Sequence, residues 1–342
     1  MFTLTPSSRI FAIGDVHGCS RELAALLAKI DPGPRDTVVF LGDYVDRGPD
    51  SKGVVDLILA LRKRCNVVTL KGNHEELFID FLESPESANA GLFILNGGSS
   101  TIASYAGPGG SFEIPEAHVQ FFYDLQPFFA TENYFFVHAG VPIKPLSAID
   151  PKADEHTLLW GRQPFLSSNY KWEKLVVHGH TPVSDPEVLK NRINVDTGCV
   201  YDGMLTAIEL PRMKFHTVPR GTKGEPINVP LRDLGEARVA VRFTGRIPVE
   251  AARDGEPPYA FETLNYNQFG LLMQDVGQRA KAMFNVGDVI SGVIGSGPSA
   301  IQFSGTVARI EARSEVRLYG VSIDRVTNGN EGREWIQRPR GS

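Results

Sequence analysis

Residues 9–18 read RIFAIGDVHG, and this stretch, together with two that resemble it, decides the fold. The second stretch is DTVVFLGDYVDRG at residues 36–48, and the third is NVVTLKGNHE at residues 66–75. Each begins with a continuous apolar run, which is typical of a strand buried on both faces of a parallel sheet. Each run is followed by glycine and then aspartate or asparagine. Because open α/β sheets bind ligands beyond the carboxyl ends of their strands, we expect these polar side chains to share one crevice.

Apolar residues at helical spacing occupy residues 20–30 and 52–64, between successive strands. Asp50 and Ser51 are expected to cap the second helix. The order strand, helix, strand, helix, strand predicts right-handed parallel crossovers. Residues 84–115 are rich in Gly, Ser and Pro and predict an irregular excursion over the crevice, which we interpret as a substrate-facing lid.

Later stretches repeat the pattern of a strand with polar residues at its end. YFFVHAGV at residues 134–141 carries His138, and KLVVHGHTPV at residues 174–183 carries His178 and His180. The segments INVDTGCV and MLTAIEL follow, and their alternation of apolar and polar residues predicts a closing hairpin or sheet edge.

The composition limits the classes of function. The chain has 342 residues, a length that fits two domains and a sizeable core. A formal net charge of −5 gives no whole-chain basic field, so we expect no bulk nucleic-acid binding. No apolar run reaches membrane-spanning length and no secretion signal is visible, so we expect a cytoplasmic protein without membrane association. Cys19, Cys65 and Cys199 are odd in number and widely spaced, and we expect buried free thiols.

The composition changes after Leu210. Residues 213–235 are dense in Pro, Lys, Arg and Gly with weak periodicity, and we place a linker there, after a first domain at residues 1–212. Residues 236–330 contain short β segments separated by turn residues, which predict a small all-β barrel. Residues 331–342 are polar and predict a flexible tail.

The polar residues at the strand ends are carboxylates, an amide and imidazoles, without cysteine. This mixture suits a pair of Mn, Fe or Zn ions rather than a soft metal, and we expect manganese first. Two divalent metal ions held a few ångströms apart clamp a phosphate and lower the pKa of a bridging water, which yields hydroxide near neutral pH. A ligand shared between the ions should be a carboxylate, for which Asp43 is the candidate. Arg47 is the candidate for binding two phosphate oxygens at once through its guanidinium group.

The motifs GDVHG, GDYVDRG and GNHE, in this order, resemble those of the metal-dependent phosphoprotein phosphatases, the PPP superfamily. The likeness is closest to bacterial and phage-lambda-type members and covers the predicted first domain. It implies an α/β (α+β) fold, a calcineurin-like metallophosphoesterase β-sandwich flanked by helices. The parallel strands would then be only the central part of a mixed sheet.

The resemblance also implies roles for particular residues. The metal ligands would be Asp15, His17, Asp43, Asn73, His138 (in VHAGV) and His180 (in GHTP). His74 would protonate the leaving alkoxide and would be oriented by Asp46. Arg47 and Arg162, the latter in WGR, would hold the phosphoryl oxygens. His178 matches no family role, and we interpret it as a structural histidine.

The function implied by the resemblance is that of a two-metal phosphomonoesterase, a Ser/Thr phosphoprotein phosphatase that uses a metal-bridging hydroxide. Its partner would be a phosphoprotein substrate. The alternative is a symmetrical diadenosine tetraphosphate hydrolase, the activity of the sister group. The second motif of that group often lacks the aspartate present here as Asp46, which favours phosphoprotein chemistry.

The second domain resembles a PilZ domain, a module that binds cyclic di-GMP. The resemblance rests on R-x-x-x-R from Arg242 to Arg246 and on [D/N]-x-S-x-x-G from Asn265 to Gly270, in which Asn267 replaces the serine. Two arginines can fork onto phosphates and the guanine O6/N7 edge, and an asparagine can meet a guanine edge. The resemblance implies an enzyme regulated by cyclic di-GMP. A cyclic di-GMP receptor with vestigial catalysis is the alternative of another class.

Overall fold

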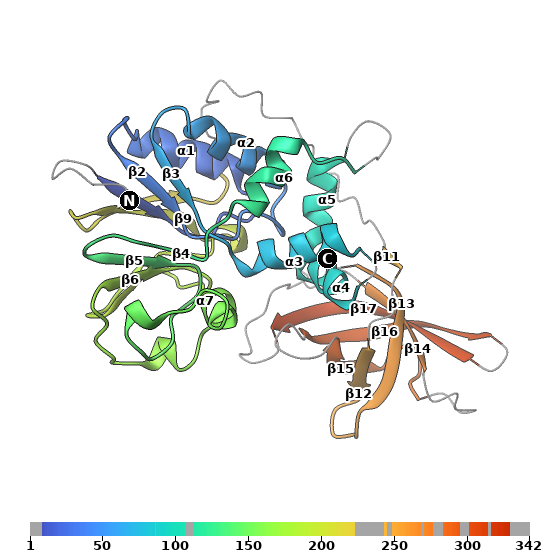
Figure 1. Ribbon diagram of the computed structural model, residues 1–342. Helices are drawn as coiled ribbons and strands as arrows, with labels where there is room; N and C mark the ends of the chain where they lie inside the picture. Colours follow the sequence, from blue (N-terminus) through green and yellow to red (C-terminus); the bar gives the residue numbers. More distant parts are fainter. Residues whose placement is uncertain are drawn as a thin grey trace. The chain divides into compact units, whose positions relative to one another are not determined.

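The computed structural model describes residues 9–85, 87–106, 112–222, 243–244, 248–267, 270–275, 283–294, 301–313 and 316–328. The chain divides into two compact units, whose elements are labelled in Figure 1. The first unit comprises Met1–Glu76 and Ser100–Arg238, and the second comprises Leu77–Ser99 and Val239–Ser342. Helix α3 (Asn73–Glu83) therefore begins in the first unit and continues in the second.

The first unit contains a mixed five-stranded sheet in the order β10-β9-β1-β2-β3. Strands β1, β2 and β3 are parallel, as the three apolar runs predict, whereas β9 pairs antiparallel with β1 and β10. The strands are β1 (Ile10–Ile13), β2 (Thr37–Phe40), β3 (Asn66–Thr69), β9 (Met204–Leu210) and β10 (Lys214–Pro219). The prediction of parallel strands within a mixed sheet is confirmed.

A second five-stranded sheet has the order β4-β5-β6-β8-β7. Its strands are β4 (Phe128–Ala130), β5 (Tyr134–Val137), β6 (Leu175–His178), β7 (Glu187–Val188) and β8 (Arg192–Asn194). Apolar side chains of both sheets form one buried cluster, with Val39 from the first sheet and Phe136, Val177 and Ile193 from the second. Burying each such side chain contributes about 2 kcal/mol to stability. The two sheets thus form the expected sandwich around this core.

The expected hairpin between INVDTGCV and MLTAIEL is wrong. β8 pairs with β6 and β7 in the second sheet, whereas β9 pairs with β1 and β10 in the first. Residues 195–203 cross from one sheet to the other. Alternation of apolar and polar residues indicates that a segment is a strand, but it does not specify the partner strand.

Helices α1 (Ser20–Ile30) and α2 (Ser51–Leu61) lie between the strands in the order that the sequence predicts. Figure 1 shows both helices on the same side of the first sheet. The Asp50 side chain accepts a hydrogen bond from the backbone N–H of Gly53 at 2.9 Å, which confirms it as the N-cap of α2.

Residues 84–115 contain helices, so the expected irregular excursion is wrong for the described part of this segment. Helix α3 is followed by α4 (Ala88–Phe93), a π-helical turn η1 (Ile94–Gly98) and α5 (Ser99–Tyr105). Ser87 caps α4 by accepting a hydrogen bond from the Ala90 N–H at 3.1 Å. Gly97 has a φ of 104°, which glycine adopts without strain, so the glycine pair marks a kink between helices.

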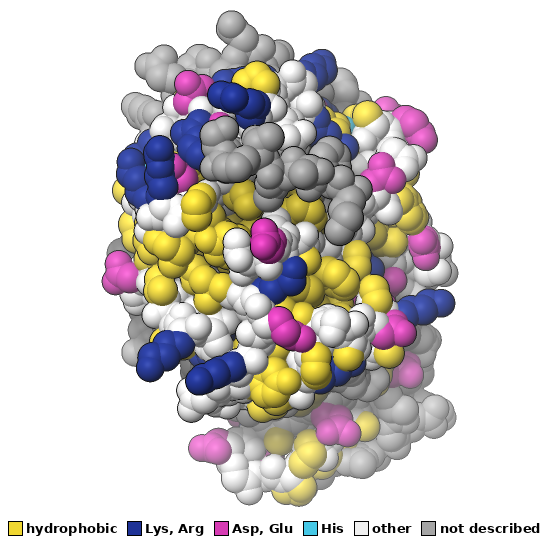
Figure 2. Space-filling model, turned by 60° about the vertical axis from the view of Figure 1, so that its left-hand side comes forward, with side chains coloured by type: hydrophobic (Ala, Val, Ile, Leu, Met, Phe, Trp, Pro, Cys, Tyr) yellow, Lys and Arg dark blue, Asp and Glu magenta, His cyan; other side chains and the backbone are white. Residues whose placement is uncertain are grey.

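Further helical elements of the first unit are α6 (Glu116–Tyr123), η2 (Leu146–Ala148), α7 (Glu155–Trp160), η3 (Phe165–Ser167) and η4 (Cys199–Tyr201). Within the described ranges, every helix is too short or too polar to cross a bilayer. Cys19, Cys65 and Cys199 are buried and free, as predicted. Figure 2 shows one face of the molecule, on which cationic and anionic side chains are interspersed with hydrophobic ones.

The beginning of the predicted linker forms a strand. β10 pairs with β9 along Lys214–Pro219, and its His216 is buried with Nε2 3.0 Å from Glu209 Oε2. Because the inward-facing residue His216 is polar, this segment lacks the regular apolar alternation that would indicate a strand. Residues 223–235 of the predicted linker lie outside the described residues.

The second unit contains a closed six-stranded antiparallel β-barrel, as the short β segments predict. Its strands are β12 (Pro248–Ala252), β13 (Tyr259–Asn267), β14 (Gly270–Asp275), β15 (Val289–Ile294), β16 (Ile301–Arg313) and β17 (Val316–Asn328), with β11 (Phe243–Thr244) added to β13. The barrel closes because β13 pairs with both β12 and β14. Phe261, Phe284 and Tyr319 form an aromatic cluster, in which the Tyr319 ring meets the other two edge-on at 5.5 and 5.7 Å.

The residues expected to bind cyclic di-GMP are only partly described. Arg242 and Arg246 lie outside the described residues. Asn265 and Asn267 lie on β13, and Gly270 begins β14 directly opposite Asn267. The predicted tail at residues 331–342 also lies outside the described part of the chain.

Candidate active site

The six side chains expected to bind metal follow strands of both sheets. They are Asp15 and His17 after β1, Asp43 after β2, Asn73 at the start of α3, His138 after β5 and His180 after β6. Each of these residues is at most 6% exposed. Burying so many polar side chains is costly unless they are paired or bind metals. The structure thus brings together the whole ligand set that the motifs indicate.

Backbone strain is concentrated at this site. Eight described residues other than glycine have positive φ, and five of them are predicted site residues. These five are His17 (φ 43°), Asp43 (φ 53°), Asp46 (φ 73°), Arg47 (φ 67°) and His180 (φ 66°). Such conformations cost about 1 to 3 kcal/mol each and persist where the surroundings enforce them, as they do at functional sites.

Three donor atoms converge in what we call the second cluster, formed by Asp43, Asn73, His138 and His180. His138 Nε2 lies 2.9 Å from Asn73 Oδ1 and 3.1 Å from His180 Nδ1, and the last two atoms are 3.0 Å apart. His138 Nδ1 donates to the Leu41 carbonyl at 2.9 Å, so its Nε2 carries a lone pair. A lone pair facing the Asn73 oxygen is repulsive unless a cation lies between them. The geometry therefore fits a divalent metal.

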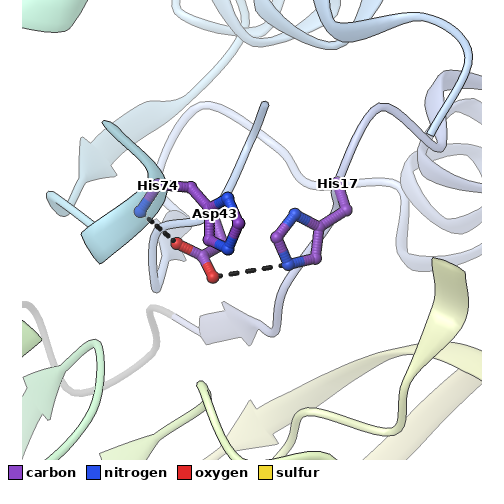
Figure 3. A group of neighbouring side chains, drawn as sticks. All are labelled: His17, Asp43 and His74. Atoms are coloured by element: carbon purple, nitrogen blue, oxygen red, sulfur yellow. Dashed lines mark hydrogen bonds and ion pairs between the residues drawn. The ribbon is translucent and has the colours of Figure 1, made fainter. Parts of the chain in front are cut away.

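Asp43 links this cluster to the first cluster, formed by Asp15, His17 and Asp43. Its Oδ1 lies 3.4 Å from His138 Nε2, and its Oδ2 lies 3.4 Å from His17 Nε2. Figure 3 shows the Asp43 carboxylate between His17 and His74, with the backbone N–H of His74 donating to Oδ1 at 3.2 Å. One oxygen of Asp43 thus faces each cluster, as a bridging carboxylate requires.

His17 has the orientation of a metal ligand. Its Nδ1 donates to the Val45 carbonyl at 2.7 Å, which leaves Nε2 as an acceptor. That acceptor receives a hydrogen bond from Arg47 Nη1 at 2.6 Å, so a guanidinium already places positive charge at the first cluster. The Arg47 guanidinium also lies over the ring of Tyr201, 5.6 Å from its centroid. Arg47 is therefore beside the site, where it could contact a bound phosphoryl group.

The histidines of both clusters are held neutral, the form that binds metals. Burial lowers the pKa of His138. Burial lowers the pKa of His180 well below its ordinary value, and the Arg162 charge acts in the same direction. Burial, together with the Arg47 charge, also lowers the pKa of His17. Arg162 lies two residues after the end of helix α7 (Glu155–Trp160), and its role in holding phosphoryl oxygens stays a prediction.

His74 and Asp46 form a buried pair. His74 Nδ1 lies 2.6 Å from Asp46 Oδ2, and both side chains are fully buried. Asp46 Oδ1 accepts a hydrogen bond from the Thr101 hydroxyl at 2.7 Å. Burial raises the pKa of Asp46 well above its ordinary value, and the hydrogen bond from Thr101 opposes this effect. The pair has the geometry of a general acid and the carboxylate that orients it.

Asp196 is a site residue that the sequence analysis missed. It is 2% exposed, and its Oδ1 accepts from the Gly198 N–H at 3.0 Å. Burial, the charge of Asp196 and the charge of Asp43 raise the pKa of Asp15 well above its ordinary value. Burial raises the pKa of Asp196 to about 6. Adjacent buried carboxylates favour a cation between them. Asn194 interrupts the apolar residues before Asp196, so the strand-end pattern that marks the other ligands is absent here.

Glu75 lies in the first turn of helix α3 and has a supporting role that the sequence analysis did not predict. It is fully buried, and its Oε1 accepts from the N–H groups of Tyr44 at 2.8 Å and Val45 at 3.2 Å. Its Oε2 accepts from the N–H groups of Asp43 at 2.8 Å and Gly72 at 3.0 Å. Glu75 therefore fixes the loop that presents the bridging aspartate.

His178 shows the environment of a structural histidine. It is buried, its Nδ1 lies 3.1 Å from the Gly179 carbonyl, and its ring meets Phe165 edge-on at 5.0 Å. Burial lowers its pKa to about 3.

A third group of potential metal-binding atoms belongs to Cys19, Glu22 and Cys199. Its carboxylate already accepts hydrogen bonds from Arg220 Nη1 at 3.0 Å and from the Gly221 N–H at 2.8 Å. A cation there would compete with the guanidinium, so we assign no metal to this group.

The family model of the calcineurin-like phosphoesterases matches residues 8–207. The chain belongs to this family. Calcineurin-like phosphoesterases use two divalent metals, and the buried groups His17–Asp43–His74 and Asp43–His138–His180 could hold metal ions. The chain is thus a metal-dependent phosphoesterase, which confirms the predicted enzyme class and fold.

Curated relatives extend this comparison. The chain is 30% identical to bis(5'-nucleosyl)-tetraphosphatase PrpE [asymmetrical] from Anoxybacillus flavithermus, over 60% of this chain and 92% of the relative. It is also 30% identical to the protein of the same name from Geobacillus thermodenitrificans, again over 60% and 92%. A solved protein serine/threonine phosphatase from Saccharomyces cerevisiae shares 20% identity, with a TM-score of 0.45, over 65% of this chain and 82% of that one.

Proposed function

We propose that this phosphoesterase hydrolyses dinucleoside polyphosphates, as a bis(5'-nucleosyl)-tetraphosphatase. The observation that carries the proposal is the likeness to relatives of that name, which covers 92% of their length at 30% identity. Their name specifies asymmetrical cleavage. We therefore propose unequal nucleotide products in place of the symmetrical cleavage that the sequence analysis considered.

The site residues would bind the metals, orient the phosphate oxygens and deliver a proton to the leaving group. When bound, two divalent metals lower the pKa of water to supply a nucleophile and neutralise the phosphoryl oxygens. We propose that the first and second clusters hold them, with manganese as the first choice and iron or zinc as the alternatives that the mixed oxygen and imidazole donors also suit. Arg47 and Arg162 would orient the phosphate oxygens. Because Nδ1 of His74 is engaged by Asp46, its Nε2 would deliver the proton to the leaving oxygen.

A second candidate is a Ser/Thr phosphoprotein phosphatase, and the pair of His74 and Asp46 favours it. A serine alkoxide is a strongly basic leaving group and needs a proton as the P–O bond breaks. A nucleotide leaves as a phosphate, which is far less basic and needs a general acid less. A pair held at 2.6 Å is therefore the observation that favours a phosphomonoester substrate as the second candidate.

The two candidates are separated by turnover of diadenosine tetraphosphate and of a phosphoserine peptide, measured in parallel with the full chain and Mn²⁺. We expect ATP and AMP from the dinucleotide, with kcat/KM at least about tenfold above that for the peptide. A preference for the peptide would support the phosphoprotein phosphatase instead. Asp15→Asn should abolish turnover of both substrates, and retained turnover in this variant would remove the two-metal mechanism.

We also propose that the barrel binds cyclic di-GMP and regulates the enzyme. The support is the sequence pattern from Arg242 to Gly270. A continuous helix that runs from the catalytic residues into the second unit would connect the two sites. Helix α3 starts with Asn73 and His74 in the first unit and continues in the unit that contains the barrel, from which the chain returns at Ser100. The presence of every expected metal ligand argues against a receptor with vestigial catalysis. The cytoplasmic location remains a prediction from the sequence.

Calorimetric titration of the full chain with cyclic di-GMP tests this proposal, with Arg246→Ala as the control. We expect binding by the wild type, at least about tenfold weaker binding by the variant, and a change in kcat at saturation. Binding without any change in kinetics would exclude regulation. Binding by a chain without bound metal or turnover would support the receptor alternative.

A further inference from the structure

The hydroxyl group of Thr101 forms hydrogen bonds with both the backbone and the carboxylate of Asp46. This residue lies on helix α5 and is fully buried. Its hydroxyl oxygen lies 2.7 Å from Asp46 Oδ1 and 2.8 Å from the Asp46 backbone nitrogen. It also lies 3.0 Å from the Ser51 hydroxyl. One side chain thus contacts both the carboxylate and the backbone of Asp46.

The hydrogens in this network can be assigned from the chemistry of the groups. The Asp46 backbone N–H can only donate, so Thr101 accepts there. The Asp46 carboxylate accepts, so Thr101 donates its single hydroxyl proton to Oδ1. Ser51 then donates to the remaining lone pair of Thr101. Every hydrogen-bonding position of the Thr101 hydroxyl is used, which fixes its rotamer.

The second oxygen of the same carboxylate faces the proposed general acid. Asp46 Oδ2 lies 2.6 Å from His74 Nδ1, so Thr101 and His74 occupy the two ends of one carboxylate. Asp46 has a φ of 73°, a conformation that aspartate adopts only when its surroundings hold it. Because Thr101 bonds both to the backbone and to the side chain of Asp46, it limits rotation of the carboxylate away from His74.

We propose that Thr101 is a positioning residue for the general acid of this phosphoesterase. Its hydroxyl fixes the orientation of the Asp46 carboxylate. In this orientation Asp46 holds His74 toward the leaving oxygen. The inference rests on the proposed role of His74 in the hydrolysis. It does not depend on whether the natural substrate is a nucleotide or a phosphoprotein, since it concerns only the protonation of the leaving group.

The test uses two substrates that differ in their need for a proton. Phenyl phosphate has a basic leaving group and requires general acid catalysis, whereas 2,4-dinitrophenyl phosphate has an acidic leaving group and does not. Thr101→Val removes the hydroxyl at nearly constant volume, and Thr101→Ser retains it. Ser51→Ala is the matched control, because Ser51 contacts Thr101 and the Asp46 N–H but not the carboxylate. All are measured as the full metal-loaded chain.

For Thr101→Val we expect kcat on phenyl phosphate to fall about 30-fold, a part of the roughly 100-fold or more that a general acid contributes, with KM unchanged. We expect a fall of less than about threefold on dinitrophenyl phosphate, and recovery of most of the loss in Thr101→Ser. Ser51→Ala should change both substrates by the same factor. A merely structural role of Thr101 would also lower both rates equally, because it would act through the fraction of folded enzyme.

Equal losses on the two substrates, or no loss on either, overturn the inference. Failure of Thr101→Ser to recover the phenyl phosphate rate overturns it as well. If Thr101→Val does not fold, Thr101→Cys is used, since a thiol is similar in size and a weak donor. A wild-type chain inactive on diadenosine tetraphosphate as well as on both aryl phosphates would instead overturn the proposed function. The two failures are therefore distinguishable.

Discussion

The Glu75 carboxylate holds the bridging residue Asp43 through its backbone, because Glu75 Oε2 accepts the Asp43 N–H at 2.8 Å. The same carboxylate also accepts the N–H groups of Tyr44, Val45 and Gly72. Its two oxygens thus accept hydrogen bonds from four backbone N–H groups, in a stretch that contains the positive-φ residues Asp43 and Asp46. A buried carboxylate at this place determines where the bridging ligand points.

Glu75→Gln tests this relationship. An amide group can accept on only one side, so donors on the other side lose their partner and face an NH₂ group. We expect a loss of about 2 to 4 kcal/mol in the free energy of unfolding, together with weaker metal binding. Denaturant unfolding and calorimetric titration with Mn²⁺ measure the two effects. Glu76→Gln is the control, since glutamine can also accept the hydrogen bond that Trp160 Nε1 donates to Glu76.

Metal binding should stabilise the chain through the second cluster. A ligand at 100 times its Kd stabilises the folded state by about 2.7 kcal/mol, so adding Mn²⁺ to metal-free protein should raise the Tm. In His138→Ala this rise should be much smaller, because one of three converging donors is lost. His156→Ala removes an exposed histidine and should keep the full rise. A rise that is equal in both variants would contradict the assignment of His138.

The sequence was sufficient for the parts of the site that follow buried strands. An apolar run that ends in glycine and aspartate or asparagine predicts a strand and a polar residue beyond its end, and Asp15, Asp43 and Asn73 do follow β1, β2 and β3. His138 and His180 came from the family resemblance, and the strands before them bring both to the second cluster. The barrel was visible because turn residues separate its strands at short intervals.

The residues that support the ligands could not be predicted, for a physical reason. Thr101 meets Asp46 across 55 positions of the chain, from a helix in a segment whose glycines and serines indicated a loop. Glu75 accepts hydrogen bonds from backbone N–H groups. Because the backbone is the same whatever the side chains are, the sequence does not indicate these bonds. Asp196 was read as part of a strand and its role depends on a crossing between two sheets, which local alternation cannot reveal. Glu75 stands in the motif GNHE, but its role, like those of Thr101 and Asp196, depends on contacts that only the folded chain makes.

Gly179→Ala should displace the Asp15 carboxylate. A Cβ built on Gly179 meets Asp15 Oδ1 at less than van der Waals distance, whereas Asp15 Cγ at 3.4 Å and Asp196 Cβ at 3.6 Å lie at ordinary contact distances. Because only the end of a side chain must move, we expect little change in Tm but a fall in kcat/KM of about 100-fold, typical of a misplacement near 1 Å. Gly33→Ala is the control, since its added Cβ meets only Asp36 Oδ2 at 3.7 Å. An unchanged kcat/KM would show that Asp15 tolerates the shift.

Asp36 links the start of β1 to the turn after α1. Its contribution to the free energy of unfolding should be lost at acid pH. Its Oδ2 accepts from Arg9 Nη2 at 2.5 Å and from the Gly33 N–H at 2.8 Å. Burial works against ionisation, but these hydrogen bonds and the Arg9 charge lower the pKa of Asp36 below its ordinary value. A lowered pKa in the folded state means that the carboxylate stabilises the fold above the unfolded-state pKa of about 3.9. This contribution is lost as the pH falls from there through the folded-state value.

Asp36→Asn should therefore lower the free energy of unfolding of the first unit by about 1 kcal/mol at pH 7, because Arg9 is partly exposed and its ion pair is screened. The difference between wild type and variant should shrink below pH 4 and vanish once Asp36 is protonated in the folded state. Urea unfolding at pH 7, 5 and 3 measures the difference, and other acid-sensitive groups cancel because both chains share them. Asp31→Asn, at an 81% exposed side chain paired with Arg64, should show almost no difference at any pH. A difference for Asp36→Asn that stays constant down to pH 3 would mean that it arises from lost packing and not from the charge.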